Sequence, residues 1–514
     1  MAYTPFGAEG IIIRVEADIR RGIPGVDITG LAQGAVREAR DRVRAAFRNS
    51  GYVFPQERIL INLAPAGVRK EGAALDLPIA VAVMAAAGLV PNPEGLMMLG
   101  ELELSGTLRP VRGVLAAVAA GIRAGISDFI VPKENASQAA ILADGHYAGA
   151  DTLKEAIEAL ITRAQTGSFA PQSRPDPEAN VVPIQDFSEV RGQARYKRAL
   201  EIAAAGGHNL LVFGPPGAGK TMLARRMSGI MAPLLPWEAV EVTSLYSLAE
   251  QAGQVSFITH PPFRSPHHSA SVEGILGGGK NVRPGEISLS HFGTLFLDEA
   301  PEFRAHVLQS LREPLEDGVI TISRAEGPVR LPADFQLLLA ANTCPCGRLG
   351  MHRLGDEPLS DTVLTCFCSP EEIHRYWRKF GAALLDRVEL RIAVQSPEIT
   401  LCTTGEGESS ETIACRVLRA VQVQRDRYQN SGIRRNARMP ASLIDRYCKL
   451  KAESEKALHS ASSKLGLSGR AFHGILRVAR TIADLEGSDT LLPVHIMEAL
   501  DYRRQGDDPY DILE

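Results

Sequence analysis

Short apolar runs alternate with amphipathic stretches through the middle of the chain. Three of these runs, LLVF (210–213), TLFL (294–297) and FQLLLAAN (335–342), carry no charged residue. Such runs are typical of strands that are buried on both faces of a parallel sheet. Between the last two runs, apolar side chains recur at helical spacing: Phe303, Val307, Leu308, Leu311 and Leu315. We therefore expect an α/β domain over residues 184–395.

The flanking regions have different patterns. Residues 1–165 mix β-rich and helical stretches, whereas residues 396–514 have mainly helical patterns. The clearest helix spans 469–487, with Gly487 as its expected stop. Its apolar positions are Phe472, Ile475, Leu476, Ala479, Ile482 and Ala483. The segment TGSFAPQSRPDPEANVVP (166–183) is rich in proline and poor in large apolar side chains, which predicts an extended linker.

Length and composition add few constraints. The 514 residues correspond to about three domains at roughly 100–200 residues each. No apolar run is long enough for a membrane span, and Leu77–Val90 is expected to form a buried core helix. The net charge of −4 argues against a uniformly basic surface but allows a local basic groove. Seven cysteines in a chain without a leader fit the reducing cytoplasm.

The octapeptide GPPGAGKT follows the first apolar run and precedes a helical stretch. It matches G-x-x-x-x-G-K-[ST] in the context that supports a phosphate-binding loop. The expected phosphate-binding residues are Gly214, Pro215, Pro216, Gly217, Ala218, Gly219, Lys220 and Thr221. Lys220 should reach the β- and γ-phosphates, and Thr221 should bind Mg²⁺. ATP and Mg²⁺ are therefore the expected cofactors.

Two later strand ends complete this predicted site. Asp298 follows the second apolar run and would hold Mg²⁺, while Glu299 would activate the attacking water. Asn342 ends the third run, where its side chain could reach the γ-phosphate and the water. A cap of the strand end is the alternative role for Asn342. Together these residues predict ATP hydrolysis.

Four cysteines follow Asn342 as two Cys-x-Cys pairs: Cys344, Cys346, Cys366 and Cys368. Four thiolates can enclose a tetrahedral structural Zn²⁺, and His352 could replace one of them. The alternative is a loop of reduced thiols, because the spacing within each pair is tighter than usual.

His267 and His268 are a second pair of possible metal ligands. Adjacent histidines point apart on a strand, so a structural or subunit-contact loop is the stronger expectation for them.

These motifs resemble those of AAA+ ATPases. In LLDRVEL, Arg387 resembles the arginine finger that acts on the ATP of the next subunit, which implies a ring. Arg470 resembles the sensor-2 arginine of the AAA+ lid, with Arg477 as the alternative. Gly192 and Gln193 precede the loop as in many AAA+ proteins, where this region contacts the adenine side.

Residues 316–342 resemble a hairpin inserted before the sensor strand in the clade of minichromosome-maintenance helicases and magnesium chelatase. In the helicases, a basic residue of this hairpin touches DNA inside the central pore. Arg324 occupies that place and Arg330 lies nearby, so both are expected DNA contacts. A solvated turn arginine is the alternative.

Across nearly its whole length the chain resembles the YifB/ComM type of magnesium-chelatase-like AAA+ ATPases. The segments that carry this resemblance are PFRSPHH, RPGEISLSH, PLEDGVITISRA, CPCG, LLDRVEL and RVARTIADLEG. It implies a DNA-stimulated hexameric translocase, active in branch migration during recombination or natural transformation, with recombination proteins as partners. A chelatase motor acting on a protein or tetrapyrrole, or a regulatory ATP-binding adaptor, is the alternative. The family usually has Asn-Pro-Cys-Pro-Cys-Gly, and here Thr343 replaces the first proline.

The N-terminal region resembles the α+β proteolytic domain of Lon. The resemblance places Ala74 where Lon has its serine and Leu115 where it has its lysine. A Ser-Lys dyad needs a hydroxyl and an amine, so we do not expect proteolysis. The resemblance thus implies three domains, Lon-like, AAA+ α/β and all-α lid.

The sequence also contains two arginine clusters, in VREARDRVRAAFR (36–48) and QRDRYQNSGIRRNARMP (424–440). For each cluster two interpretations stay open, a solvated surface and a contact with DNA.

Overall fold

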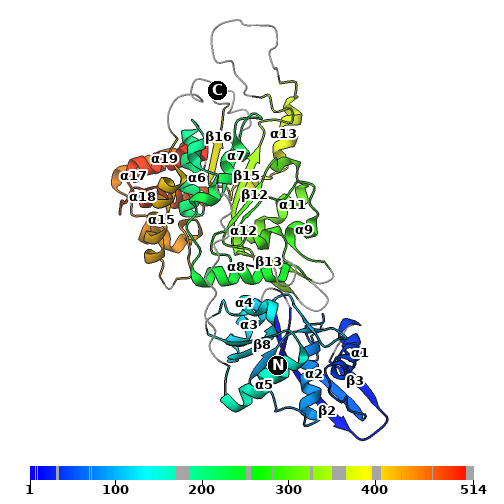
Figure 1. The fold of residues 1–514 in the computed structure, drawn as a ribbon. Helices are drawn as coiled ribbons and strands as arrows, with labels where there is room; N and C mark the ends of the chain where they lie inside the picture. The colour runs from blue at the N-terminus through cyan, green and yellow to red at the C-terminus, as the bar shows by residue number, and fades with distance from the viewer. Residues whose placement is uncertain are drawn as a thin grey trace.

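The structure is a computed structural model, and its central element is a five-stranded parallel sheet (Figure 1). It describes residues 1–514 except 6, 8–9, 31–33, 69, 71, 143, 170–184, 250–255, 280–281, 324–327, 350–365, 396–406, 430, 466 and 505–514. The strands are β11 (Phe263–Arg264), β12 (Thr294–Leu297), β15 (Gln336–Ala341), β10 (Leu210–Phe213) and β16 (Leu390–Ala393), in that spatial order. The three predicted apolar runs are confirmed as β10, β12 and β15, and all three are fully buried.

Alternate side chains of each strand enter two different cores. In β10, Leu210 and Val212 pack on one face of the sheet, whereas Leu211 and Phe213 pack on the other. The first face is covered by α6 (Ala194–Gly206), α15 (Ser410–Arg427) and α18 (Gly469–Leu485). The second is covered by α11 (Ala305–Ser310), α12 (Arg312–Asp317) and α13 (Pro370–Arg378). Burial on both faces explains why these strands are apolar without alternation.

The amphipathic stretch after β12 folds as two short helices, α11 and α12, instead of one continuous helix. All five of its predicted face residues are buried. The chain then forms an antiparallel hairpin of β13 (Val319–Ile322) and β14 (Val329–Pro332). Val319 pairs with Pro332 and Ile322 pairs with Val329, so the hairpin directly precedes β15 as predicted.

Helices make up most of the described C-terminal region. Besides α15 and α18, they include α16 (Ile444–Tyr447), α17 (Ala452–Leu465) and α19 (Pro493–Arg504). The Ser468 side chain accepts a hydrogen bond from the backbone N–H of Ala471 and so caps α18 at its predicted start. Gly487, just beyond its end, has a φ of 69°, a conformation that glycine adopts without strain.

The N-terminal region carries a four-stranded sheet, a three-stranded sheet and a short antiparallel pair, β6 (Glu101–Leu102) with β7 (Leu108–Arg109). The first has the order β1 (Ala2–Thr4), β2 (Ile11–Arg20), β4 (Arg58–Ala64), β3 (Gly25–Thr29), and the second is the parallel set β5 (Leu96–Met98), β8 (Asp128–Pro132), β9 (His146–Ala150). The helices are α1 (Gly34–Asn49), α2 (Asp76–Ala86), α3 (Val114–Arg123) and α5 (Leu153–Thr166). The apolar run from Leu77 forms the buried helix α2, as predicted. Among the described residues, no helix is long and apolar enough to cross a membrane.

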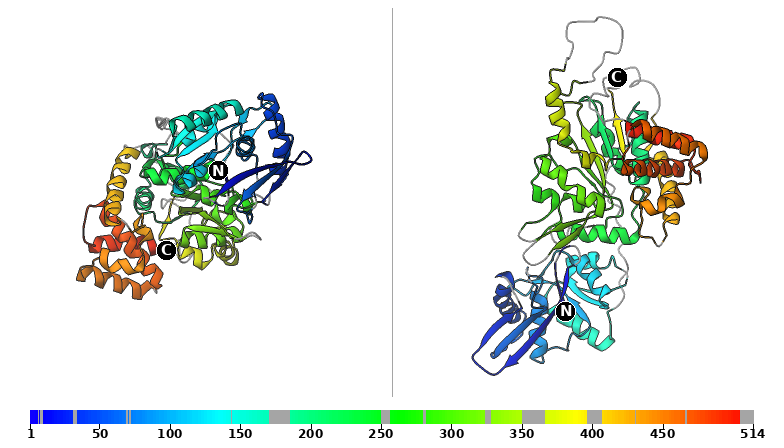
Figure 2. Two further views of the ribbon diagram at one scale, coloured as in Figure 1. Left: turned by 90° about the horizontal axis from the view of Figure 1, so that it is seen from below. Right: turned by 180° about the vertical axis from the view of Figure 1, so that it is seen from behind.

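Helix α8 (Pro236–Ala249) joins the N-terminal region to the central sheet domain (Figures 1 and 2). Leu248 of α8 packs in the same apolar cluster as Tyr3 and Val114. The backbone N–H of Gly113 donates a 3.0 Å hydrogen bond to the carbonyl of Ser247. The N-terminal region therefore contacts a helix that belongs to the central domain.

Candidate active site

The predicted phosphate-binding loop lies at the carboxyl edge of the sheet. Because β10, β12 and β15 are parallel, the segments that follow them meet at this edge: the loop, Asp298 and Asn342. Helix α7 (Lys220–Arg226) begins immediately after the loop. Gly217 and Gly219 have φ angles of 80° and 81°, so the loop uses glycine where other residues would be strained.

Lys220 is held inside this loop. Its Nζ donates hydrogen bonds to the carbonyl oxygens of Gly214 (2.7 Å) and Pro215 (2.8 Å), and to Oδ1 of Asn342 (3.1 Å). Burial lowers the pKa of Lys220 to about 8, although the carboxylates of Asp298 and Glu299 work in the opposite direction. A cation held in a poorly solvated site is well suited to pair with phosphate oxygens.

Thr221 and Asp298 lie in direct contact. The Thr221 hydroxyl donates a 2.8 Å hydrogen bond to Oδ2 of Asp298. A hydroxyl and a carboxylate are the hard oxygen donors that Mg²⁺ prefers, and it keeps water or phosphate oxygens at its other positions. The two residues therefore fit the Mg²⁺ that accompanies a nucleotide.

Glu299 adopts an uncommon backbone conformation beside Asp298. Its φ is 49°, in the left-handed region, and its backbone N–H donates to Oδ1 of Asp298 over 3.0 Å. Such conformations cost about 1–3 kcal/mol and persist where the surroundings impose them, often at functional sites. The turn leaves the Glu299 carboxylate largely exposed at the sheet edge.

His268 is a neighbour of Glu299 that the sequence did not reveal. Its Nδ1 lies 3.9 Å from Oε2 of Glu299. The expectation that His267 and His268 point apart on a strand is wrong, because their rings lie side by side with centroids 4.1 Å apart. Both follow β11, and the N–H of Ala270 donates to the carbonyl of His267 over 2.9 Å to close a turn. The paired histidines were the available sequence signal, but a structural or subunit-contact loop was the stronger expectation for them.

Polar contacts fix the other parts of this edge. Gln193, with a φ of 52°, donates from Nε2 to the carbonyls of Ala218 (3.2 Å) and Gln395 (2.8 Å). It thereby joins the phosphate-binding loop to the end of β16. The backbone N–H of Asn342 donates to the Tyr376 hydroxyl over 3.3 Å, which ties the end of β15 to α13.

Arg387 and Arg470 do not belong to this cluster. Arg387 lies just before β16, which is parallel to β10, so it is at the amino edge of the sheet and about 10 Å or more from the loop. Both arginines bind the carboxylate of Glu316, Arg470 at 2.9 Å. The hydrogen bond and charge of Arg387, with those of Arg470, lower the pKa of Glu316, a residue that no sequence signal indicated. Arg477 is half-buried on α18, where burial lowers its pKa and the charge of Glu389 acts in the opposite direction.

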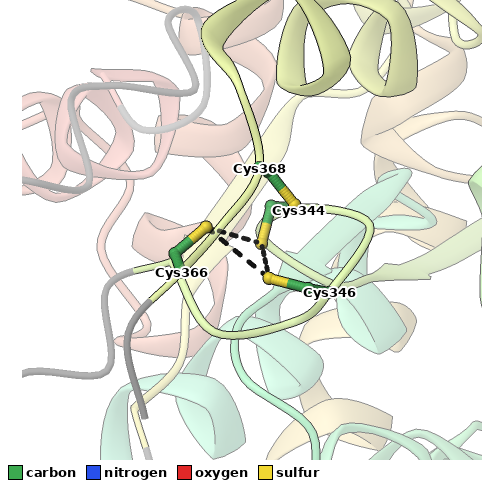
Figure 3. A group of neighbouring side chains, drawn as sticks. All are labelled: Cys344, Cys346, Cys366 and Cys368. Atoms are coloured by element: carbon green, nitrogen blue, oxygen red, sulfur yellow. Dashed lines mark hydrogen bonds between the residues drawn. The ribbon is translucent and has the colours of Figure 1, made fainter. Parts of the chain in front are cut away.

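The four predicted cysteines gather beyond the end of β15 (Figure 3). Their sulfur atoms all lie within 4.8 Å of one another, and three of the separations are 3.3, 3.5 and 3.7 Å. A tetrahedral Zn²⁺ with bonds of about 2.3 Å holds its sulfurs about 3.8 Å apart. The cluster of Cys344, Cys346, Cys366 and Cys368 is therefore compatible with such an ion, whereas His352 lies outside the described residues.

The cysteine cluster also lies against the phosphate-binding loop. A side chain at Gly347 would come within 2.9 Å of the Pro216 ring, so the backbone approaches the loop closely there. Trp377 donates from Nε1 to the carbonyl of Thr343 over 3.0 Å. The same short segment thus connects Asn342, the cysteines and helix α13.

One of the two predicted DNA contacts lies on the described part of the hairpin. Arg324 lies outside the described residues. Arg330 is exposed on β14 and pairs across the hairpin with Thr321, while the neighbouring Leu331 is buried. A side chain at Gly7 would come within 3.0 Å of the Arg330 carbonyl, so the N-terminal region lies against strand β14 of the hairpin.

The two positions that the resemblance matches to the Lon dyad both carry apolar side chains. Ala74 packs against an apolar cluster and Leu115 is fully buried. Arg42 of the first arginine cluster forms a bidentate ion pair with buried Asp76, at 2.7 and 2.9 Å. Arg40, Arg44 and Arg48 of the same cluster are exposed on α1.

Comparisons with known proteins extend over nearly the whole chain. Three family models match it in order: Subunit ChlI of Mg-chelatase over residues 15–135, Magnesium chelatase, subunit ChlI over 186–401, and Magnesium chelatase, subunit ChlI C-terminal over 407–503. The chain is 42% identical over 495 residues to the uncharacterized protein YifB of Salmonella typhimurium, covering 96% of this chain and 94% of that protein.

Two further relatives carry names that describe a role. The chain is 39% identical over 512 residues to the competence protein ComM of Haemophilus influenzae, covering 97% of this chain and 95% of that protein. It is 28% identical over 142 residues to the Lon protease of Geobacter metallireducens, covering 26% of this chain and 17% of that protein. The likeness to Lon is thus confined to one segment.

Proposed function

Because the chain belongs to the YifB/ComM-type family of magnesium-chelatase-like proteins, we propose that it is an ATP-hydrolysing AAA+ motor that acts on DNA. The observation that carries the ATPase proposal is the convergence of Lys220, Thr221, Asp298, Glu299 and Asn342 at one edge of the sheet. A regulatory adaptor would not need this whole set.

Each residue of the cluster has a distinct part in the proposed reaction. Lys220 binds the β- and γ-phosphates, and Thr221 with Asp298 holds the Mg²⁺ that neutralises their charge. Glu299 orients the attacking water and accepts its proton, while the Asn342 amide binds the γ-phosphate and the same water. Water attacks the γ-phosphorus as the bond to the bridging β–γ oxygen breaks, giving ADP and phosphate.

The position of Arg387 supports a ring, which we propose to be a hexamer. An arginine at the amino edge cannot reach the nucleotide of its own chain, but it can reach that of a neighbouring subunit. Arg387 would then neutralise transition-state charge in trans, and Arg470 lies on the same edge and is available for the same interface. Closure of a ring would transfer both arginines from Glu316 to phosphate.

The DNA part of the proposal rests on the hairpin and on the relatives. The printed name of one relative, competence protein ComM, suggests a role in natural transformation. Arg324 and Arg330 would contact backbone phosphates from the hairpin without reading bases. ATP hydrolysis would move the hairpins along the strand, so that the ring translocates during branch migration.

We also propose a structural Zn²⁺ at the four cysteines and a division into three domains. The three domains are a Lon-like domain over residues 1–165 without a Ser-Lys dyad, an AAA+ core over 184–395 and a lid over 396–514. A linker over 166–183 separates the first two. Zinc would fix the segment that follows Asn342, and the Lon-like domain would support the hairpin through Gly7.

ATP turnover with and without DNA tests the proposal. The protein alone, with single-stranded DNA and with a four-way junction should be compared, with Lys220→Ala as the blank. We expect stimulation by DNA that is lost in Arg324→Ala and Arg330→Ala but kept in Arg123→Ala, which alters an exposed arginine of α3. Turnover that is indifferent to every DNA would contradict the DNA motor and favour a chelatase-type partner, and absence of turnover would favour an adaptor.

A further inference from the structure

A small cavity lies at the edge of the central sheet opposite to the nucleotide cluster. It has a volume of about 50 Å³, and its lining includes Phe292, Gln336, Arg434, Arg435 and Arg438. Gln336 begins β15, whose far end carries Asn342, about 20 Å away at 3.3 Å per residue. The cavity is therefore separate from the phosphate-binding loop.

The arginines come from the second arginine cluster of the sequence, but two of them are already paired. Arg434 binds Glu238 at 2.6 Å and lies 3.8 Å over the Phe292 ring. Arg438 binds Asp334 at 2.6 Å. These contacts join the C-terminal helical region to the sheet domain, and they neutralise both carboxylates.

The third lining arginine, Arg435, has no ion pair with a carboxylate among the described contacts, and neither has Arg425, a member of the same sequence cluster whose charge acts on Arg435. Arg435 donates to the Arg434 carbonyl over 3.0 Å, and Arg425 donates to the Pro233 carbonyl over 3.0 Å. The Nε of Arg425 is buried and has no hydrogen-bond partner in the described part of the chain. Four guanidinium groups thus share two carboxylates, which leaves an excess positive charge beside the cavity.

The charge of Arg435 is poorly compensated where it lies. Burial, together with the nearby charges of Arg434 and Arg425, lowers its pKa to about 9, although Glu238 and Asp334 act in the opposite direction. An arginine this far below its ordinary range gains strongly from a neighbouring anion. At neutral pH it keeps its proton and remains a cation.

The backbone at the cavity is also strained. Among the described non-glycine residues, Gln193, Glu299 and Phe292 have a positive φ. The first two belong to the nucleotide cluster, and Phe292, with a φ of 56°, lines this cavity. A bulky side chain in this conformation is a genuine outlier, of the kind that surroundings impose at binding sites.

We propose that this cavity binds a phosphate group, with Arg435 as its main ligand and Arg434 and Arg438 beside it. Guanidinium groups donate to phosphate oxygens through paired N–H groups. The volume corresponds to roughly four water molecules at about 10–15 Å³ each, which is comparable to one tetrahedral oxyanion. Oε1 of Gln336 is buried without a described hydrogen-bond donor, so a protonated phosphate oxygen could donate to it. The phosphate could be free or part of a nucleic-acid backbone.

Thermal unfolding with inorganic phosphate tests this site. Lys220→Ala is the background, because it removes the phosphate ligand of the nucleotide loop, and chloride keeps the ionic strength constant. We expect phosphate to raise the Tm of Lys220→Ala by about 2 °C or more, and the rise to vanish when Arg435→Gln is added. The matched control is Arg446→Gln, which alters an exposed arginine of α16 and should keep the rise. An equal rise with and without Arg435, or no rise at all, overturns the proposal.

A measurement on the unmutated cavity covers the case in which Arg435→Gln does not fold. Phenylglyoxal modification of Arg435, mapped by mass spectrometry in the Lys220→Ala protein, should be slowed at least about threefold by phosphate, and modification of Arg446 should not be. Equal slowing at both arginines, or at neither, contradicts the site.

The fluorescence anisotropy of labelled single-stranded DNA distinguishes the two sources of the phosphate group. Weaker DNA binding after Arg435→Gln assigns a backbone phosphate. Unchanged DNA binding, with the rise in Tm by inorganic phosphate still dependent on Arg435, assigns free phosphate.

Discussion

The ammonium group of Lys220 donates a 3.1 Å hydrogen bond to Oδ1 of Asn342. This bond joins the loop after β10 to the end of the neighbouring strand β15. The backbone of Asn342 is itself held by the Tyr376 hydroxyl of α13. These two contacts fix the position of the Asn342 amide, which is the condition for efficient stabilisation of a transition state.

Removing the Asn342 amide should affect catalysis more than binding. We expect Asn342→Ala to lower kcat about 100-fold, because a preorganised amide contact in the transition state is worth about that much. Lys220 still holds the phosphates, so the Kd for ATP should change less than about threefold. Steady-state turnover and nucleotide titration measure the two effects, with Asn92→Ala as a surface control. A parallel loss of binding would show that Asn342 serves the ground state instead.

The lowered pKa of Lys220 predicts a pH dependence of ATP binding. The free protein loses this proton near pH 8, whereas bound phosphate oxygens stabilise the protonated form and raise the pKa. Above about pH 8, binding must take up a proton, so the affinity should fall as the pH rises from about 7 to 9. Calorimetry in two buffers of different ionisation enthalpy measures the uptake. Lys220→Arg keeps its charge and should lose the dependence, and a flat affinity in the wild type would refute the assignment.

His268 should position Glu299. With its Nδ1 3.9 Å from the Glu299 carboxylate, it limits the orientations that this carboxylate can adopt. We expect His268→Gln to lower kcat about 10-fold, the lower end for a residue that orients a catalytic group, with the KM for ATP unchanged. The neighbouring His267, which hydrogen-bonds to Ser269 at 2.7 Å, offers the control His267→Gln. Equal effects of the two substitutions would indicate a purely structural turn.

Mixed rings test whether Arg387 acts between subunits. Arg387→Ala should still bind ATP but should not turn it over, and Lys220→Ala should do neither. In an equal mixture, about a quarter of interfaces pair an intact nucleotide site with an intact arginine, so activity should return to about that fraction. Turnover of the mixture against each variant alone measures this. If mixing restores no activity although the subunits co-assemble, Arg387 does not work in trans.

The cysteine cluster should contain metal. We expect about one zinc per chain by elemental analysis, and removal with a mercurial and a chelator should lower the Tm by about 5 °C or more. Cys366→Ser should lose the metal. Cys415→Ser, which alters an exposed cysteine outside the cluster, should retain it. A metal-free protein of unchanged Tm would favour the alternative of reduced thiols.

Much of the nucleotide site could be predicted because its chemistry is local in sequence. An apolar strand, a glycine-rich turn and a lysine define the phosphate loop within a dozen residues, and Asp298 and Asn342 each follow an apolar strand. The four cysteines were also predictable, because two pairs at fixed spacing suggest one ion. The orientation of His267 and His268 was predicted wrongly, since a strand was assumed where the chain makes a turn.

The sequence by itself determined strands β10, β12 and β15, the end of helix α18 at Gly487 and the motif residues that follow those strands, because these depend on neighbours a few positions apart. Only the tertiary structure decided that Glu316 binds both Arg387 and Arg470, and that Arg434, Arg435 and Arg438 surround a cavity with Phe292. Glu316 lies 71 and 154 residues from its two arginines, and Phe292 lies more than a hundred residues before the arginines of the cavity. Their contact depends on how helices pack against the sheet, and no periodicity along the chain encodes that packing.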